Sequence, residues 1–156
     1  MFQENCYVVS DDTKECVIID CGAFYEEEKK AITDYIKDNG LQPKHLLCTH
    51  GHVDHNFGNK FILDTFGLRP EVSKHDMPLM ERLGSQAMAF TGADCGNDFP
   101  APSKHIDDGD TVTFGNHSLR VIGTPGHSPG SVFLYCEEEG VAFSGDTLFQ
   151  MSIGRT

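Results

Sequence analysis

Four side chains that can bind a metal ion lie within six positions of this sequence. The segment "LLCTHGHVDHNFGN" carries His50, His52, Asp54 and His55 directly behind an apolar run. Neutral imidazole and carboxylate are common protein ligands of Zn²⁺ and related ions, and an H-x-H pair that leaves a strand can aim both rings at one position. Asp54 and His55 can face a second position close by. The spacing therefore predicts a site for two adjacent metal ions.

Two later segments offer further ligands. A catalytic metal ion needs about three protein ligands and an open position for water. The segment "GTPGHSPGS" places His127 in a loop stiffened by proline, just after the strand-like run "SLRVI". The segment "FSGDTLF" places Asp146 at a strand end, behind a glycine that lets the backbone approach closely. We therefore expect His50, His52, His127 and Asp146 to converge on one metal position.

Hydrophobic periodicity predicts the elements that position these side chains. Short apolar runs bounded by turn residues predict strands at 5–10, 15–20, 45–48, 71–73, 111–114, 118–123, 132–136 and 141–145. Helical spacing predicts helices at 25–39, 57–66 and 77–83. Strands that alternate with helices and are followed by clustered strands indicate an α/β protein with a mixed sheet or two sheets.

The segment Gly84–Ser103 has three glycines, two prolines and no clear period. In a compact domain, a long segment of this composition is usually a functional loop or lid. We expect it to lie beside the metal site, to hold no regular element and to be more mobile than the strands.

The composition limits the class of protein. A chain of 156 residues is long enough for one compact domain with its own core. Its 24 acidic and 12 basic residues give a formal net charge of −12, which would repel a phosphate backbone, so we expect no nucleic-acid partner. The six cysteines form no C-x-x-C pair, and the sequence shows neither a signal pattern nor the roughly 18 apolar residues of a membrane span. These features predict a reduced, cytoplasmic protein with no membrane partner.

Three ordered motifs resemble the metallo-β-lactamase superfamily. They are T-H-x-H-x-D-H at Thr49–His55, G-H-S-P-G-S at Gly126–Ser131 and G-D-T-L-F at Gly145–Phe149. The segments "FQENCYVV" and "GDTLFQMSIGRT" are most similar to glyoxalase II-type hydrolases, particularly the short forms without an added helical domain. The resemblance implies an αββα sandwich with the metals at the sheet edges, formed by a single, incomplete metallo-β-lactamase-like domain over 1–156. It also implies that the C-terminal part and a first strand are missing from this chain.

The resemblance assigns ligands to each of two metal ions, residue by residue. The ligands of the first ion are His50, His52 and His127. The ligands of the second ion are Asp54 and His55, and Asp146 bridges both. Relatives take one more histidine for the second ion from a segment beyond G-D-T-L-F, and no histidine follows Asp146 in this sequence. We therefore expect the first ion to bind more tightly than the second.

The activity that the resemblance implies is hydrolysis of a thioester or a related small acyl substrate. A hydroxide activated by the metals would attack the carbonyl, and Asp54 would orient it. Two zinc ions are expected, although iron or manganese would suit the same ligands. Relatives use a basic side chain near the position of Arg155 to meet an anionic substrate.

Two other functions stay open at this point. Persulfide dioxygenases of the same superfamily also resemble this pattern and hold a single iron at the positions of His50, His127 and Asp146. A metal-binding domain that has lost catalysis is the other alternative. A true β-lactamase is disfavoured, because such enzymes commonly carry arginine where His55 stands.

Overall fold

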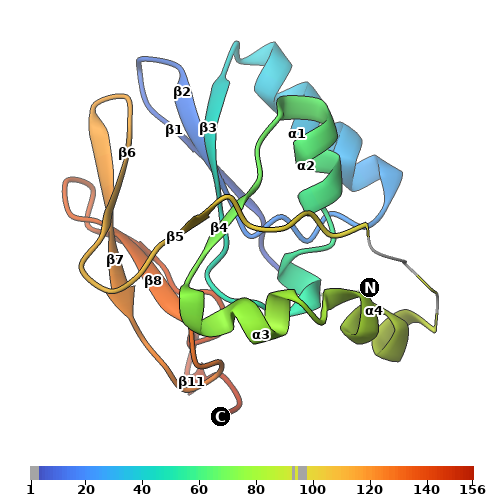
Figure 1. Ribbon diagram of the computed structural model, residues 1–156. Helices are drawn as coiled ribbons and strands as arrows, with labels where there is room; N and C mark the ends of the chain where they lie inside the picture. Colours follow the sequence, from blue (N-terminus) through green and yellow to red (C-terminus); the bar gives the residue numbers. More distant parts are fainter. Residues whose placement is uncertain (1–3, 93, 95–97) are drawn as a thin grey trace.

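Two β-sheets lie face to face in the computed structural model, which describes residues 4–92, 94 and 98–156 (Figure 1). The first sheet has the strand order β1-β2-β3-β4-β5. Its strands are β1 (Tyr7–Ser10), β2 (Glu15–Ile19), β3 (Gln42–Leu47), β4 (Pro70–Val72) and β5 (Lys104–His105). β1 is antiparallel to β2, and the other pairs are parallel. The loops that follow β2, β3 and β4 therefore meet at one edge of the sheet.

The second sheet is antiparallel and has the strand order β6-β7-β8-β9. Its strands are β6 (Thr111–Phe114), β7 (His117–Gly123), β8 (Val132–Cys136) and β9 (Val141–Phe143). A small hairpin of β10 (Leu148–Phe149) and β11 (Ser152–Ile153) follows it. The segment between β7 and β8 and the segment after β9 carry two of the predicted metal ligands.

The helices and helical turns are α1 (Glu26–Asp38), η1 (Val53–His55), α2 (Asn59–Phe66), η2 (Lys74–Asp76), α3 (Met77–Met80) and α4 (Leu83–Thr91). α1 and α2 lie on the side of the first sheet that faces away from the second sheet, and α3 and α4 lie at the lower end of the molecule in the view of Figure 1. α2 ends at Gly67, whose φ of 74° is a conformation that suits glycine. None of the helices in the described ranges is long and apolar enough to cross a membrane.

β2 lies at the centre of the core because both of its faces are covered. Val17 and Ile19 are fully buried in a cluster with residues of β6, β7 and β8, between the two sheets. Ile18 is fully buried in a second cluster with Ile36 of α1 and Ile62 of α2. A continuous apolar run in a strand is what burial on both faces requires. The order helix, sheet, sheet matches three layers of the predicted αββα sandwich.

The predictions for the long elements are confirmed, and two predictions for the middle of the chain are wrong. The helix predicted at 77–83 is regular only over Met77–Met80. The prediction that Gly84–Ser103 holds no regular element fails because α4 spans Leu83–Thr91. Leu83 and Ala87, four positions apart, are both buried and fix this helix to the core despite the glycine at its start. Part of the predicted lid, residues 93 and 95–97, lies outside the described residues.

Candidate metal centre

Three of the predicted ligands come together as a histidine cluster, formed by His50, His52 and His127. One ligand atom from each side chain lies within 4.8 Å of the others. His50 and His52 follow β3, and His127 lies in the loop between β7 and β8. His52 Nδ1 and His127 Nε2 are 2.9 Å apart, and the ring centroids of His50 and His127 are 4.9 Å apart. The two sheets therefore supply one site jointly.

The hydrogen bonds of these rings suit a bound cation. His127 Nδ1 donates to the backbone carbonyl of Arg155 at 2.8 Å, so the lone pair of its Nε2 faces His52. His50 Nε2 is buried and has no hydrogen-bond partner among the described residues. A buried polar nitrogen is costly when nothing satisfies it. Imidazole nitrogens left free in this way fit a divalent metal ion.

A second set of ligand atoms, the mixed cluster, consists of His50, His55 and Asp146. These atoms also lie within 4.8 Å of one another. His55 Nε2 is 3.2 Å from Asp146 Oδ1, and the other oxygen of Asp146 is 3.6 Å from His127 Nε2. Asp146 thus lies between His55 and His127, and His50 belongs to both clusters. This position suits the predicted bridging role of Asp146, which remains a prediction.

The side chains of the other two predicted site residues, Asp54 and Arg155, belong to neither cluster. Asp54 Oδ2 is 3.9 Å from His55 Nε2, and the side chain of Asp54 is 25% exposed. It belongs to neither cluster of described ligand atoms. Arg155 is exposed, and its contact with His127 comes from its backbone carbonyl. The roles of Asp54 and Arg155 therefore stay predictions.

The clusters differ in their electrostatics. Burial, together with the neighbouring imidazoles, lowers the pKa of His50 to about 2, so this ring is neutral and free to bind a metal. Burial also acts to lower the pKa of His55, but the carboxylates of Asp146 and Asp20 outweigh it and raise the pKa to about 11. The hydrogen bond from His55 lowers the pKa of Asp146. Without metal, the mixed cluster therefore holds an ion pair.

Asp20, at the end of β2, is a site residue that the sequence analysis missed. Its carboxylate accepts from the backbone N–H and the hydroxyl of Thr49, each at 2.7 Å, and lies 3.1 Å from His55 Nδ1. It thereby leaves the Nε2 of His55 facing Asp146. The backbone φ of Asp20 is 51°, an uncommon value for a residue other than glycine. A buried apolar strand that ends in an aspartate was the available signal.

Asp76 and Asn56 are two more missed residues that hold the ligand loop. Both are fully buried. Asn56 donates to the backbone carbonyls of His50 and His52 at 3.2 and 2.6 Å. Asp76 accepts from the backbone N–H of Gly51 at 2.8 Å. In the sequence, neither stands out from an ordinary turn or cap residue.

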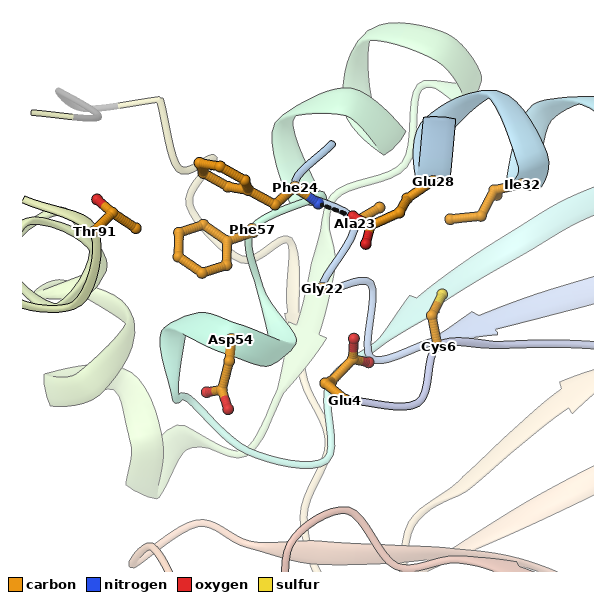
Figure 2. Close-up of a pocket in the computed structure, with 10 residues that line it drawn as sticks. All are labelled: Glu4, Cys6, Gly22, Ala23, Phe24, Glu28, Ile32, Asp54, Phe57 and Thr91. Atoms are coloured by element: carbon orange, nitrogen blue, oxygen red, sulfur yellow. Dashed lines mark hydrogen bonds between the residues drawn. The ribbon is translucent and has the colours of Figure 1, made fainter. Parts of the chain in front are cut away.

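A cavity of about 180 Å³ opens beside the ligand loop (Figure 2). Phe24 and Phe57 form its aromatic wall, with ring centroids 5.0 Å apart and planes at 69°. Figure 2 shows Asp54 and Glu4 on the side of the cavity opposite Phe24. Glu4 also lines a second cavity of about 240 Å³ together with His55 and Asp146. The aromatic cavity therefore lies next to the mixed cluster.

The comparisons with known proteins define the class. A family model described as "Metallo-beta-lactamase superfamily" matches residues 1–156, and the chain therefore belongs to this superfamily of metal-dependent hydrolases. The match confirms the predicted superfamily and, with the structural neighbours, the α/β fold.

Particular relatives refine this assignment. The chain is 35% identical over 156 residues to the hydroxyacylglutathione hydrolase GloC of Haemophilus influenzae, and covers 99% of itself and 71% of that protein. The crystal structure of the BLEG-1 B3 metallo-β-lactamase aligns with a TM-score of 0.83 at 35% identity, over 99% of this chain and 72% of that chain. The crystal structure of TTHA1623 in a di-iron-bound form aligns with a TM-score of 0.81 at 35% identity, over 98% of this chain and 72% of that chain.

Proposed function

We propose that this protein hydrolyses acyl thioesters with two divalent metal ions. The observation that carries the proposal is the buried, unpartnered Nε2 of His50, in the one residue common to both ligand clusters. The similarity to a hydroxyacylglutathione hydrolase supports a thioester as the substrate. Zinc is the proposed metal because imidazole and carboxylate ligands suit it, and the di-iron form of a similar protein makes iron the alternative to test.

Each group of side chains has a defined task in this proposal. Two bound divalent ions would lower the pKa of a coordinated water from 15.7 towards about 7 and polarise a substrate carbonyl. The residues that would hold the first ion are His50, His52 and His127, and those that would hold the second are Asp54, His55 and Asp146, with Asp146 shared. Asp54, partly exposed beside His55, would also accept a hydrogen bond from the attacking water and orient it.

The cavity beside Asp54 supports an uncharged acyl group in the substrate. Phe24, Phe57 and Ile32 line it, and such side chains favour an apolar group over an ion. Burial raises the pKa of Glu4 to about 8, so this carboxyl adds little negative charge at neutral pH. The acyl chain would occupy this cavity, and Arg155 would meet an anionic part of the thiol.

A substrate panel tests the proposal directly. The purified protein, loaded with zinc, is expected to hydrolyse a hydroxyacyl thioester of glutathione, to lose this activity with a chelator and to regain it with zinc. A chromogenic β-lactam, and oxygen uptake by the iron-loaded protein with a persulfide, complete the panel. Faster β-lactam hydrolysis, or oxygen uptake in place of thioester hydrolysis, would contradict the proposal.

A variant of the cavity tests where the acyl group binds. Ile32→Phe narrows the cavity, so kcat/KM for a long acyl thioester should fall about tenfold relative to an acetyl thioester, a typical effect of pocket size. Tyr35→Phe is the matched control, because Tyr35 lies on the same helix and is 50% exposed. Equal losses for both substrates would place the acyl group elsewhere.

We also propose a reducing, cytoplasmic location. Cys6, Cys16, Cys21, Cys48 and Cys136 are free thiols, and four of these five are buried. Free buried cysteine is usual where glutathione keeps thiols reduced. Fractionation of cells that express the tagged protein would test the location.

A further inference from the structure

We propose that Asp76 is a positioning residue that assembles the histidine cluster by joining its two ligand loops. The inference rests on the proposed metal role of His50, His52 and His127 and is independent of the substrate. Asp76 is the last residue of η2, which follows β4, and it is fully buried. It lies on neither of the loops that carry the three histidines.

The carboxylate of Asp76 contacts both loops at once. Its Oδ2 accepts from the backbone N–H of Gly51 at 2.8 Å and from the hydroxyl of Ser128 at 2.6 Å. Its Oδ1 accepts from the backbone N–H of Gly130 at 2.7 Å. Gly51 lies between His50 and His52, and Ser128 directly follows His127. One side chain therefore sets the separation of ligands that come from different sheets.

The glycines at two of these contacts allow the close approach. A Cβ added to Gly51 would lie 3.2 Å from the Cβ of Asp76 and 2.9 Å from the Cβ of Leu79. A Cβ added to Gly130 would lie 2.7 Å from the backbone nitrogen of Asp76. Both distances to Asp76 are shorter than an ordinary side-chain contact, so only glycine fits without a shift. The two loops are thus shaped around this carboxylate.

The charge of Asp76 supports the same role. A buried carboxylate is costly unless hydrogen bonds or a cation compensate it. Three donors bind Asp76, and no lysine or arginine forms an ion pair with it in the ranges that the structure describes. A carboxylate at this place would favour a divalent ion in the histidine cluster.

The test is the metal affinity of Asp76→Asn. The amide keeps the shape of the side chain, but it removes the charge and places an N–H₂ group against one set of donors. We expect the affinity for the first equivalent of zinc to fall about 10–100-fold, a typical loss when an outer partner of a metal site is changed. Competition with a chromophoric chelator measures this affinity, and NMR signals of the His52 and His127 rings show that the loss lies in the histidine cluster.

Glu71→Gln is the matched control. Glu71 is also a buried carboxylate and lies in β4, but its side chain pairs with His45, 2.5 Å away, and with Lys104, 3.7 Å away, rather than with the loops that carry the histidines. We expect this variant to bind the first zinc ion as the wild type does. An equal loss in Glu71→Gln would show a general effect of a weakened fold and would overturn the inference.

The remaining outcomes also decide the matter. If Asp76→Asn binds zinc as tightly as the wild type, the role of Asp76 is overturned but the metal site is not. If the histidine rings of the wild-type protein do not respond to zinc, the proposed metal site itself is overturned. If Asp76→Asn fails to fold, Ser128→Ala replaces it, because it removes one of the three donors and keeps the carboxylate. A weaker first zinc site in Ser128→Ala supports the role of Asp76, and an unchanged site overturns it.

Discussion

The histidine cluster and the mixed cluster are built on the same principle but carry different charges. In each, a buried aspartate outside the predicted ligand set fixes the ligands: Asp76 holds the backbone of two loops, and Asp20 faces the ring of His55. The histidine cluster contains the neutral ring of His50, whose Nε2 is buried and has no hydrogen-bond partner among the described residues. The mixed cluster contains an ion pair between His55 and Asp146.

This difference teaches which cluster is better prepared for a metal ion. A ligand must be deprotonated before it binds, so an ion that enters the mixed cluster must displace the proton of His55. An ion that enters the histidine cluster meets the neutral ring of His50 and satisfies its unpartnered Nε2. Ligand atoms lie close together in both clusters, but only the mixed cluster must lose the proton of His55 before it binds an ion.

Loss of His50 should have the largest effect, because it is the residue that both clusters share. We expect His50→Ala to weaken zinc binding by more than about 100-fold, beyond the loss typical of an outer partner, and to abolish hydrolysis. Isothermal titration with zinc measures the effect. His75→Ala, at an exposed histidine, is the control. A His50→Ala protein that still binds two equivalents tightly would show that His50 is not a ligand of the proposed site.

Asp20→Asn should weaken the second metal site and leave the first unchanged, whereas Asp76→Asn should weaken the first. The amide cannot hold the Nδ1 proton of His55 as the carboxylate does, so the second zinc ion should bind about 10–100-fold more weakly. The first ion should bind as in the wild type. Stepwise zinc titration, followed through the ring signals of His55 and His127, measures both. Equal weakening of the two ions would mean that the clusters are not held independently.

In the wild-type protein, the order in which the two zinc ions bind should reveal a smaller difference in affinity. We expect the His52 and His127 rings to respond to zinc before the His55 ring, with affinities that differ by about tenfold or more, because the raised pKa of His55 means that an ion there must first displace a proton. Side-chain NMR during a zinc titration resolves the order. Simultaneous changes in the signals of all three rings would show that the two clusters bind zinc with equal affinity.

Asp11 provides a comparison in which no effect on the metal is expected. It joins the β1–β2 turn to the β6–β7 turn by accepting from the backbone N–H of Asn116 at 2.6 Å. This bond, with those from Thr13, lowers the pKa of Asp11 to about 2. A lowered carboxyl pKa gives stability that is present above the unfolded value near 4 and is lost as the pH falls towards 2. Asp11→Asn should therefore flatten the dependence of thermal stability on pH between about 4 and 2.

The measurement for Asp11→Asn is the melting temperature across that pH range, together with a zinc titration at neutral pH. The zinc affinity should match the wild type, since the turn lies away from both clusters. A change in zinc affinity would mean that hydrogen bonds far from the clusters also control them, and the roles given to Asp20 and Asp76 would no longer be special.

The sequence indicates the candidate ligands more readily than the residues that hold them. His50, His52 and His55 stand in a dense motif, and His127 and Asp146 each follow a strand, so residue type and position were sufficient to propose them. Asp20 and Asp76 act through contacts with residues 25 to 54 positions away, and no local pattern records such contacts. Their surroundings, "IIDCG" and "SKHDMP", resemble an ordinary strand end and an ordinary turn.

The fold was predicted where periodicity was long enough to read. Helix α1 has 13 residues, enough to show an amphipathic pattern, whereas β5, β10 and β11 have two residues each and cannot show a period. Helix α4 was missed because Gly84 and Ser85 weaken its start. The buried Ala87 and the hydrogen bonds of Gln86 to Gly51 and Val53 outweigh that weak propensity.

The distance along the chain between His52 and His127 has a consequence for how the protein matures. These two rings meet across 75 positions, and each belongs to a different sheet. Closing so long a loop is a late and slow event in folding, because its entropy must be lost before the contact forms. A chain that is still being synthesised therefore presents the candidate ligands of the segment 50–55 without His127 and Asp146. Metal uptake would follow assembly of the sheets and would selectively stabilise chains that have completed it.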